Sequence, residues 1–184
     1  MDNGASSYRR FLAGDDGGLA EIIREYRNGL IFYLNGFVND FGAAEELAED
    51  VFVKLAVKKP RFKENASFKT WLYTIGRNEA YSALRRKKIT YVPLEELPEL
   101  PGDYDAPELR YLGEEKRRAL HRCLASLKSE YHQALWLYYF EGLSAKEISA
   151  VMKKSVHSVE TLLYRARNAL KRALETEGFN DENL

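Results

Sequence analysis

The chain has 184 residues, 28 Lys and Arg against 28 Asp and Glu, and a hydrophobic content of 45%. This length and apolar content allow one ordinary domain or two small ones with packed cores. They argue against a membrane-inserted protein, because no apolar run approaches the roughly 18 residues of a span. The N-terminus also lacks the basic-then-apolar pattern of a signal peptide, so we expect a cytoplasmic protein.

The cysteine and histidine content predicts neither a disulfide framework nor a metal site. Cys123 is the single cysteine, and its leucine neighbours favour a small buried hydrophobe over a reactive thiol. The three histidines, His121, His132 and His157, are scattered through helix-like sequence. Since no nucleophile–base pair and no glycine-rich phosphate loop appears, we expect no catalytic residue and no cofactor.

The first 58 residues predict two amphipathic helices, because apolar side chains recur every three to four positions and strand alternation is nearly absent. The helices cover residues 18–40 and 43–58, and we expect residues 1–7 to form a loose tail. Acidic side chains gather on the non-core side of the second helix, at Glu45, Glu46, Glu49 and Asp50. This face is either simply solvated or docks on a basic protein surface.

Residues 61–88 combine cations with aromatic rings. The segment holds eight Lys and Arg against two Glu, and Ser67 is placed to cap a helix that runs to about Lys88. Cation and ring alternate at i, i+4 spacing along one face of this helix, at Lys69, Tyr73, Arg77, Tyr81 and Arg85. Such a face suits single-stranded nucleic acid, because cations hold phosphates and rings stack on bases. In the alternative interpretation, the rings complete the core and the cations only add solubility.

Two further segments complete the expected architecture. The loop from Arg61 to Ala66 mixes donors and acceptors, which suits a pocket for one extruded base. Residues 89–112 hold four of the five prolines, and the acidic residues between 95 and 108 meet no Lys or Arg, which is typical of a solvated linker. We therefore predict an all-α fold of two small helical domains joined by a flexible acidic linker. The boundaries are an N-terminal helical bundle over 1–90, the linker over 91–113, a helix-turn-helix domain over 114–175 and a tail over 176–184.

The C-terminal block has helix-turn-helix spacing. Ser144 and Glu147 form a capping box for a short helix that ends at Met152, and Ser155 can cap a longer helix after a two-lysine turn. The buried stripe of the longer helix is expected at Val156, Val159, Leu163, Ala166 and Leu170. Its opposite face is polar and basic. This arrangement reads duplex DNA, although an ordinary helical hairpin with a solvated face has the same spacing.

Four stretches in this order resemble the bacterial RNA polymerase sigma factors of the extracytoplasmic-function (ECF) group. They are AEELAEDVFVKL at 44–55, RFKENASFKTWLYTIGRN at 61–78, FEGLSAKEIS at 140–149 and SVHSVETLLYRARNAL at 155–170. The resemblance covers about residues 15–175, and the segment WLYTIGRN together with the downstream helix-turn-helix is its most specific part. It implies a dissociable subunit, without catalytic residues, that directs core RNA polymerase to specific promoters.

The resemblance implies that the N-terminal domain recognises the −10 element. The 61–66 loop looks like the specificity loop that captures a flipped base. Trp71, Arg77 and Asn78 match positions at the point of strand separation, and the basic run that follows would hold the backbone of the upstream duplex. The implied −10 contacts are Phe62, Lys63, Glu64, Asn65, Trp71, Arg77, Asn78, Tyr81, Arg85, Arg86, Lys87 and Lys88.

The resemblance assigns the helix over 155–172 to the major groove of the −35 element. The implied contacts are Lys153, Lys154, Ser155, His157, Ser158, Glu160, Thr161, Tyr164, Arg165 and Lys171. The family usually has Gly and then an apolar residue where Lys153 and Lys154 stand. A non-Gly residue in a left-handed turn costs about 1 kcal/mol, which phosphate contacts by these lysines could offset. Glu160 departs from the usual basic residue and could accept a hydrogen bond from cytosine N4.

The resemblance also implies protein partners. The helix over 43–58 looks like the surface that grips the β′ clamp helices of core RNA polymerase, through Glu46, Glu49, Asp50 and Val53. The C-terminal domain would contact the β flap, and the acidic linker would thread toward the RNA exit path. An anti-sigma factor is a further partner to expect.

A different class of protein shares part of this pattern. A freestanding helix-turn-helix repressor or activator, with the N-terminal domain as a sensor or dimeriser, would bind duplex DNA tightly by itself. A sigma factor instead binds weakly alone and tightly with core polymerase. An enzyme is a more distant alternative, because the chemistry-bearing motifs are absent from the sequence.

Overall fold

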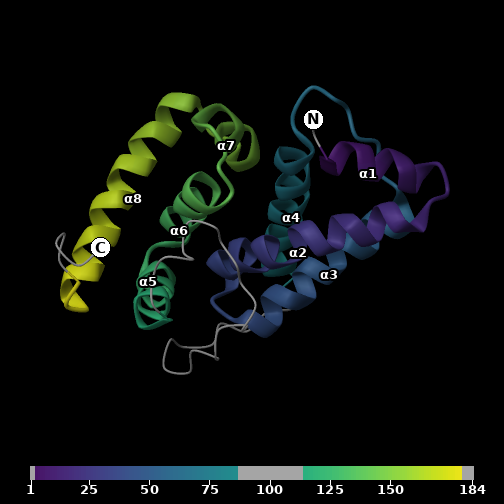
Figure 1. Ribbon diagram of the computed structural model, residues 1–184. Helices are drawn as coiled ribbons and strands as arrows, with labels where there is room; N and C mark the ends of the chain where they lie inside the picture. The colour runs from purple at the N-terminus through teal and green to yellow at the C-terminus, as the bar shows by residue number, and fades with distance from the viewer. Residues whose placement is uncertain (1–2, 87–113, 180–184) are drawn as a thin grey trace.

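A computed structural model describes residues 3–86 and 114–179, and within those ranges every regular element is a helix. Lys87, Lys88 and the predicted linker over 91–113 lie outside the described residues. The N-terminal unit consists of α1 (Asn3–Leu12), α2 (Asp16–Val38), α3 (Phe41–Lys58) and α4 (Phe68–Arg85). The C-terminal unit consists of α5 (Glu114–Ser126), α6 (Ser129–Leu135), the π-helical turn η2 (Trp136–Phe140), α7 (Ala145–Met152) and α8 (Val156–Thr176). The predicted all-α fold is confirmed (Figure 1).

Side-chain caps fix where the helices begin. The hydroxyl of Ser67 accepts a hydrogen bond from the backbone N–H of Thr70, as predicted for the start of α4. Ser144 and Glu147 form the predicted capping box at α7, with both reciprocal hydrogen bonds present. Each cap satisfies backbone N–H groups that a helix start leaves without an intrahelical partner. The capping residues in the sequence therefore mark the helix starts because their hydrogen bonds stabilise them.

Two expectations for the N-terminal unit are wrong. Residues 1–7 are not a loose tail, because α1 begins at Asn3 and buries Tyr8 and Phe11. Tyr73 does not belong to an exposed stripe, since its side chain is fully buried and packs edge-on against Tyr33 at 5.2 Å between ring centroids. The physical reason for Tyr73 lies outside α4, because α2 and the C-terminal unit together cover that side of the helix.

The two helical units pack directly against each other, α4 against α7 and α2 against α6 (Figure 1). The turn η2 also contacts α2. The ring of Phe32 in α2 stacks on Trp136 in η2 at 5.0 Å with an interplanar angle of 9°. His132 lies within hydrogen-bond distance of the Phe32 carbonyl oxygen, with Nε2 at 3.1 Å. One continuous hydrophobic cluster runs through both units. This packing of the two units against each other, called the closed arrangement below, is thus held by buried apolar contacts as well as by polar ones.

Gly36 lets α2 approach α6 closely. A Cβ atom at this position would lie 2.6 Å from Cδ2 of the His132 ring, inside the normal contact distance. The Gly36 carbonyl oxygen also accepts a 2.6 Å hydrogen bond from the Ser129 hydroxyl. A residue without a side chain is therefore required at this contact between α2 and α6.

Two histidines are buried near this contact. Burial lowers the pKa of His121 to about 4, with smaller contributions in the same direction from the neighbouring His132 and Arg117. Burial also lowers the pKa of His132, although the carbonyl oxygens of Phe32 and Leu124 favour its protonated form. Both imidazoles are consequently neutral at pH 7, and neither exposes a charge to the apolar surroundings.

We expect the free energy of unfolding to fall as the pH drops from about 6.5 to about 4. In this window the unfolded chain protonates His121 while the folded chain keeps it neutral, so stability is complete above the window and declines through it. The contribution of His121 approaches about 3 kcal/mol, at about 1.4 kcal/mol for each pKa unit. Urea unfolding of the wild type and of His121→Phe at several pH values measures it. The variant keeps a ring but does not titrate, so its stability should decline less; parallel declines would contradict the expectation.

Candidate nucleic-acid interface

The loop between α3 and α4 presents polar side chains to solvent. Lys63, Glu64 and Asn65 are exposed, and a hydrogen bond of 2.7 Å from the Asn65 N–H to the Lys63 carbonyl oxygen forms the turn between them. Phe62 lies differently, since its ring is half-buried against Phe68, at 5.6 Å between centroids. The loop therefore offers donors and acceptors at its tip and is anchored by an aromatic ring at its base.

Trp71 belongs to an aromatic cluster beneath this loop. Its ring lies 5.3 Å from Tyr8, 5.2 Å from Phe62 and 5.4 Å from Phe68, between centroids. The indole remains half-buried, so one part of it still reaches the surface. The sequence leaves open whether the rings stack on bases or complete the core. Trp71 does contribute to packing, but it also remains at the edge of the exposed loop.

The remaining −10 candidates on α4 lie further along the helix. The guanidinium of Arg77 lies over the ring of Tyr81, with Cζ 4.5 Å from the centroid. A cleft of about 380 Å³ is lined by these two residues together with Asn78, Ser82, Arg85 and Lys153. No acidic side chain is among the residues that line it. The cleft thus brings cations from α4 next to a cation from the helix-turn-helix, and its chemistry suits phosphate. Arg86 is exposed beyond it, and its Nε donates to the Ser82 carbonyl oxygen.

The C-terminal unit covers the other end of the predicted cation-and-ring face. The ammonium of Lys69 lies 3.2 Å from a carboxylate oxygen of Glu141 and donates to its carbonyl oxygen at 3.0 Å. Ser67 donates a 3.1 Å hydrogen bond to the Glu147 carboxylate. Burial alone would raise the pKa of Glu147, but hydrogen bonds from Ser144, Ser67 and Thr70 outweigh it and leave the pKa lowered. In this arrangement the start of α4 contacts protein instead of solvent.

The helix-turn-helix is formed by α7, a tight turn and α8. Lys153 adopts a left-handed conformation at φ 54°, so the turn carries the strain that a glycine would avoid. Lys154 is 3.0 Å from Glu130 in an ion pair, and Ser155 caps α8 by accepting from the Ser158 N–H. Most other −35 candidates are exposed on one side of α8, with Thr161 half-buried: His157, Ser158, Glu160, Thr161, Tyr164, Arg165 and Lys171.

The buried stripe of α8 differs from the prediction at its start. Val159, Leu163 and Ala166 are buried as expected, but Val156 has 40% of its surface exposed and Leu170 is only half-buried. Val156 occupies the first position of the helix, where the preceding turn has not yet brought the chain over the core. The exposed surface of α8 therefore begins with an apolar residue beside the polar ones.

The outer face of α3 is fully accessible. Glu46, Glu49, Asp50 and Val53 are all exposed and share one side of the helix at three- to four-residue spacing. Val57 extends this face with 75% of its surface exposed. Acidic and apolar groups side by side are suited to contact with another protein, because apolar area contributes affinity and charge contributes orientation.

The single cysteine is a packing residue in the described part of the chain. Cys123 is buried, and burial raises the pKa of its thiol, as expected for a packing residue. Among the described residues no cluster of His, Cys, Asp or Glu could hold a metal ion. Within the same ranges no helix has the length and apolar character needed to cross a membrane.

Sequence reasoning missed several residues at this interface. Glu141 and His132 connect the two units, and Tyr8 and Arg9 of α1 contact the loop before α4. The spacing of Ala5, Tyr8 and Phe11 was a usable signal for α1, because the three apolar residues recur every third position. No local pattern identifies Glu141 or His132, since their partners lie 72 and 100 residues away.

Comparison with known families covers both units. Residues 22–89 match the family Sigma-70 region 2, and residues 117–170 match the family Sigma-70, region 4. The two regions in one chain, in this order, define the class as RNA polymerase sigma factors. The matched residues include α4 with its preceding loop, α7, the turn at Lys153 and most of α8.

Curated relatives extend the match along the chain. It is 30% identical over 175 residues to the RNA polymerase sigma-H factor of Pseudomonas aeruginosa, which covers 90% of this chain and 91% of that protein. It is 31% identical over 168 residues to the RNA polymerase sigma factor YlaC of Bacillus subtilis, covering 90% and 96%. It is 27% identical to the ECF RNA polymerase sigma-E factor of Escherichia coli over 88% of each chain.

The chain belongs to the ECF group of bacterial RNA polymerase sigma factors. It directs core RNA polymerase to specific promoters and initiates transcription by −35 recognition and −10 strand capture. Two solved structures share its fold. The sigma factor RpoE in complex with the anti-sigma factor NepR from Bartonella quintana gives a TM-score of 0.66 at 23% identity, over 85% of this chain and 96% of that one. CnrH in complex with the cytosolic domain of CnrY gives 0.62 at 21% identity, over 95% and 96%.

Proposed function

We propose that the residues of the N-terminal unit divide the work of opening the −10 element. Lys63, Glu64 and Asn65 at the loop tip receive one flipped base, with Phe62 and Trp71 packed beneath them. Asn78 stands at the strand fork next to Arg77 and Tyr81, and Arg85 and Arg86, with Lys87 and Lys88 beyond the described residues, hold the upstream duplex. The observation that carries this proposal is the α4 side of the cleft, because it presents the cations Arg77 and Arg85 and the amide of Asn78 without an acidic side chain.

The −35 element is read by α8 in the major groove. Its exposed face from His157 to Arg165 provides donors and acceptors for base edges, while Lys153, Lys154 and the Ser155 cap are suited to phosphates. Glu160 supports a preference for cytosine at one position, since a carboxylate accepts from the cytosine N4 amine. The domain boundaries that follow are 1–90 for the −10 and polymerase-binding domain, 91–113 for the linker, 114–175 for the −35 domain and 176–184 for the tail.

The two units separate before both promoter elements are bound. The −10 and −35 elements are about 25 base pairs apart, or about 85 Å along B-form DNA at 3.4 Å per base pair. In the closed arrangement α4 and α7 touch, and Lys153 shares a cleft with Arg77 and Asn78. One DNA molecule cannot meet both sites across that contact, so the closed form is a state of the protein before it engages promoter DNA.

The protein acts as a subunit of RNA polymerase in the cytoplasm. The exposed face of α3 docks on the β′ clamp helices through Glu46, Glu49, Asp50 and Val53, and the C-terminal unit meets the β flap. An anti-sigma factor is a further partner, which the complexes of RpoE with NepR and of CnrH with CnrY support by analogy of fold. The chain itself contributes no catalytic residue, because polymerase supplies the chemistry.

We expect the double variant Glu49→Lys with Asp50→Lys to bind core polymerase about tenfold or more weakly, since tenfold corresponds to only about 1.4 kcal/mol. Reversing two charges turns attraction to a basic surface into repulsion. Titration of labelled protein with core enzyme measures the change. The matched control, Asp16→Lys with Glu25→Lys, makes the same change of net charge on exposed positions of α2. Equal affinities for the two double variants would refute docking through α3.

Transcription with purified core polymerase on fragmented genomic DNA tests the proposed function as a whole. We expect discrete start sites that depend on both proteins, with shared sequence near −10 and −35. The same experiment separates the rival function. A freestanding repressor or activator would bind its duplex tightly without core enzyme and would create no new start sites.

A further inference from the structure

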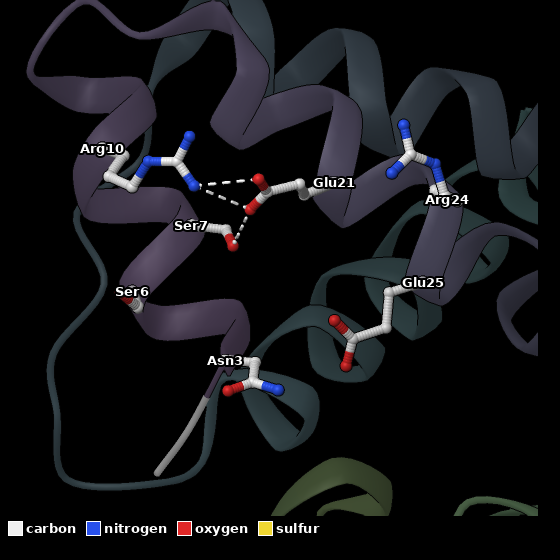
Figure 2. A pocket seen from close by; sticks show the side chains of 7 residues that line it. All are labelled: Asn3, Ser6, Ser7, Arg10, Glu21, Arg24 and Glu25. Atoms are coloured by element: carbon white, nitrogen blue, oxygen red, sulfur yellow. Dashed lines mark hydrogen bonds and ion pairs between the residues drawn. The ribbon is translucent and has the colours of Figure 1, made fainter.

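Helix α1 lies outside the matched region 2 residues, yet it is firmly seated on α2. Gly18 permits close contact, because a Cβ at that position would lie 2.2 Å from the Ser7 carbonyl oxygen. Glu21 of α2 accepts hydrogen bonds from Ser7 at 2.8 Å and from Arg10 at 2.9 Å, as Figure 2 shows. The guanidinium of Arg10 also pairs with Asp15 in the turn between the helices. These contacts fix the position of α1 on one side.

A different set of α1 side chains reaches the segment between α3 and α4. The Tyr8 hydroxyl donates a 2.7 Å hydrogen bond to the Pro60 carbonyl oxygen. The guanidinium of Arg9 forms an ion pair with Glu64 at the loop tip. The ammonium of Lys59 lies 4.8 Å above the ring of Phe11. Three residues of α1 thus hold the segment at its start, its second residue and its tip.

The loop depends on such external anchors for its shape. It lacks helical structure, and the turn from Lys63 to Asn65 is a single local hydrogen bond. Tyr8 is almost completely buried and its ring also packs on Trp71, so the hydroxyl approaches Pro60 from a fixed platform. A segment held from several sides loses less conformational freedom when it binds, which raises its affinity for a ligand that fits.

We propose that α1 is a positioning element for base capture at the −10 element, with Tyr8 and Arg9 as the positioning residues. Tyr8 sets the course of the loop at Pro60. Arg9 holds the Glu64 carboxylate in place and offsets its negative charge, so that the loop tip meets the flipped base without repulsion of the nearby phosphates. The inference rests on the proposed assignment of the 61–66 loop to −10 capture.

The first test is Tyr8→Phe, which keeps the ring and removes only the hydrogen bond to Pro60. On a promoter mapped with the wild-type protein and core polymerase, we expect open-complex formation to fall about fivefold, the equivalent of one buried hydrogen bond. Permanganate reactivity of −10 thymines reports it, while affinity for core polymerase stays unchanged. The matched control is Tyr33→Phe, which removes a buried hydroxyl that has no hydrogen-bond partner among the described residues. Equal reactivity of Tyr8→Phe and the wild type would overturn the role of Tyr8.

The second test exchanges the charges of the ion pair. Arg9→Glu alone should reduce open-complex formation. Adding Glu64→Arg should restore part of the lost open-complex formation, so that the loss in the double variant is smaller than the sum of the losses in the two single variants. A purely structural effect of α1 would lower core binding and strand opening together and would show no such coupling. Additive effects of the two changes would overturn the role of Arg9.

A third variant distinguishes failure of this inference from failure of the assignment on which it rests. Asn65→Ala changes the loop tip without touching α1. If Asn65→Ala alters which −10 base is preferred while the Tyr8 and Arg9 variants behave as wild type, the loop captures the base and α1 does not position it. If none of these variants affects strand opening, the loop assignment itself is wrong and the inference falls with it.

Discussion

Asn78→Ala is expected to lower open-complex formation about tenfold while affinity for core polymerase stays unchanged, since a well-placed amide contact to a base contributes about 1–3 kcal/mol. Asn78 is half-buried in the cation-lined cleft of α4, on a helix face separate from the acidic face of α3. Its loss removes donors and acceptors from the proposed strand fork without creating a core cavity. Permanganate reactivity of −10 thymines and polymerase titration measure the two quantities separately.

Trp71→Ala is expected to lower open-complex formation more strongly than Asn78→Ala, through two separate causes. Trp71→Ala removes a ring that packs on Tyr8, Phe62 and Phe68, so it both loosens the loop proposed to capture a base and removes a candidate stacking surface. Trp71→Phe restores much of the packing and serves as the control. Unchanged thymine reactivity in both Asn78→Ala and Trp71→Ala would sink the assignment of α4 to strand capture.

Gly36→Leu is expected to force the two helical units apart. The new side chain would begin 2.6 Å from the His132 ring, where the ring is held between the carbonyl oxygens of Phe32 and Leu124. Leucine favours the helix more than glycine does, so α2 itself is not weakened. The contact between the units is therefore lost while each unit stays folded, and the population shifts toward separated units.

Small-angle scattering of the free protein measures this shift. Gly36→Leu should have a larger radius of gyration than the wild type at the same helix content. Gly42→Leu, which places the same substitution on the exposed side of α3, should leave the radius unchanged. A compact Gly36→Leu variant with intact helices would show that the units are not held by this contact.

The sequence predicts the helices well because their signals are local. Apolar periodicity locates α2, α3 and α4, and the hydroxyls of Ser67, Ser144 and Ser155 mark helix starts through bonds to N–H groups three residues away. The two helices of the helix-turn-helix follow from the same signals, whereas the left-handed turn at Lys153 is implied only by the family resemblance. These features depend only on neighbours within one or two turns.

The arrangement of the candidate site could not be predicted in the same way. Tyr73 lies between Lys69 and Arg77 in a row at i, i+4 spacing along α4. This spacing does not reveal that other helices bury the Tyr73 side chain. Trp71 combines packing with partial exposure because α1 supplies Tyr8 from 63 positions earlier in the chain. Contacts of Lys69 with Glu141 and of Ser67 with Glu147 arise from packing between units, for which no sequence spacing exists.

The central claim is that the two helical units separate so that one chain can bind both promoter elements. Energy transfer between dyes on the two units measures this separation directly. Exposed positions Ala20 in α2 and Ala150 in α7 accept cysteines once the single native Cys123 is replaced by alanine. We expect high transfer in the free protein and its loss in the complex with core polymerase and promoter, on the same sample that yields transcript. High transfer that persists in a complex active in transcription would contradict it.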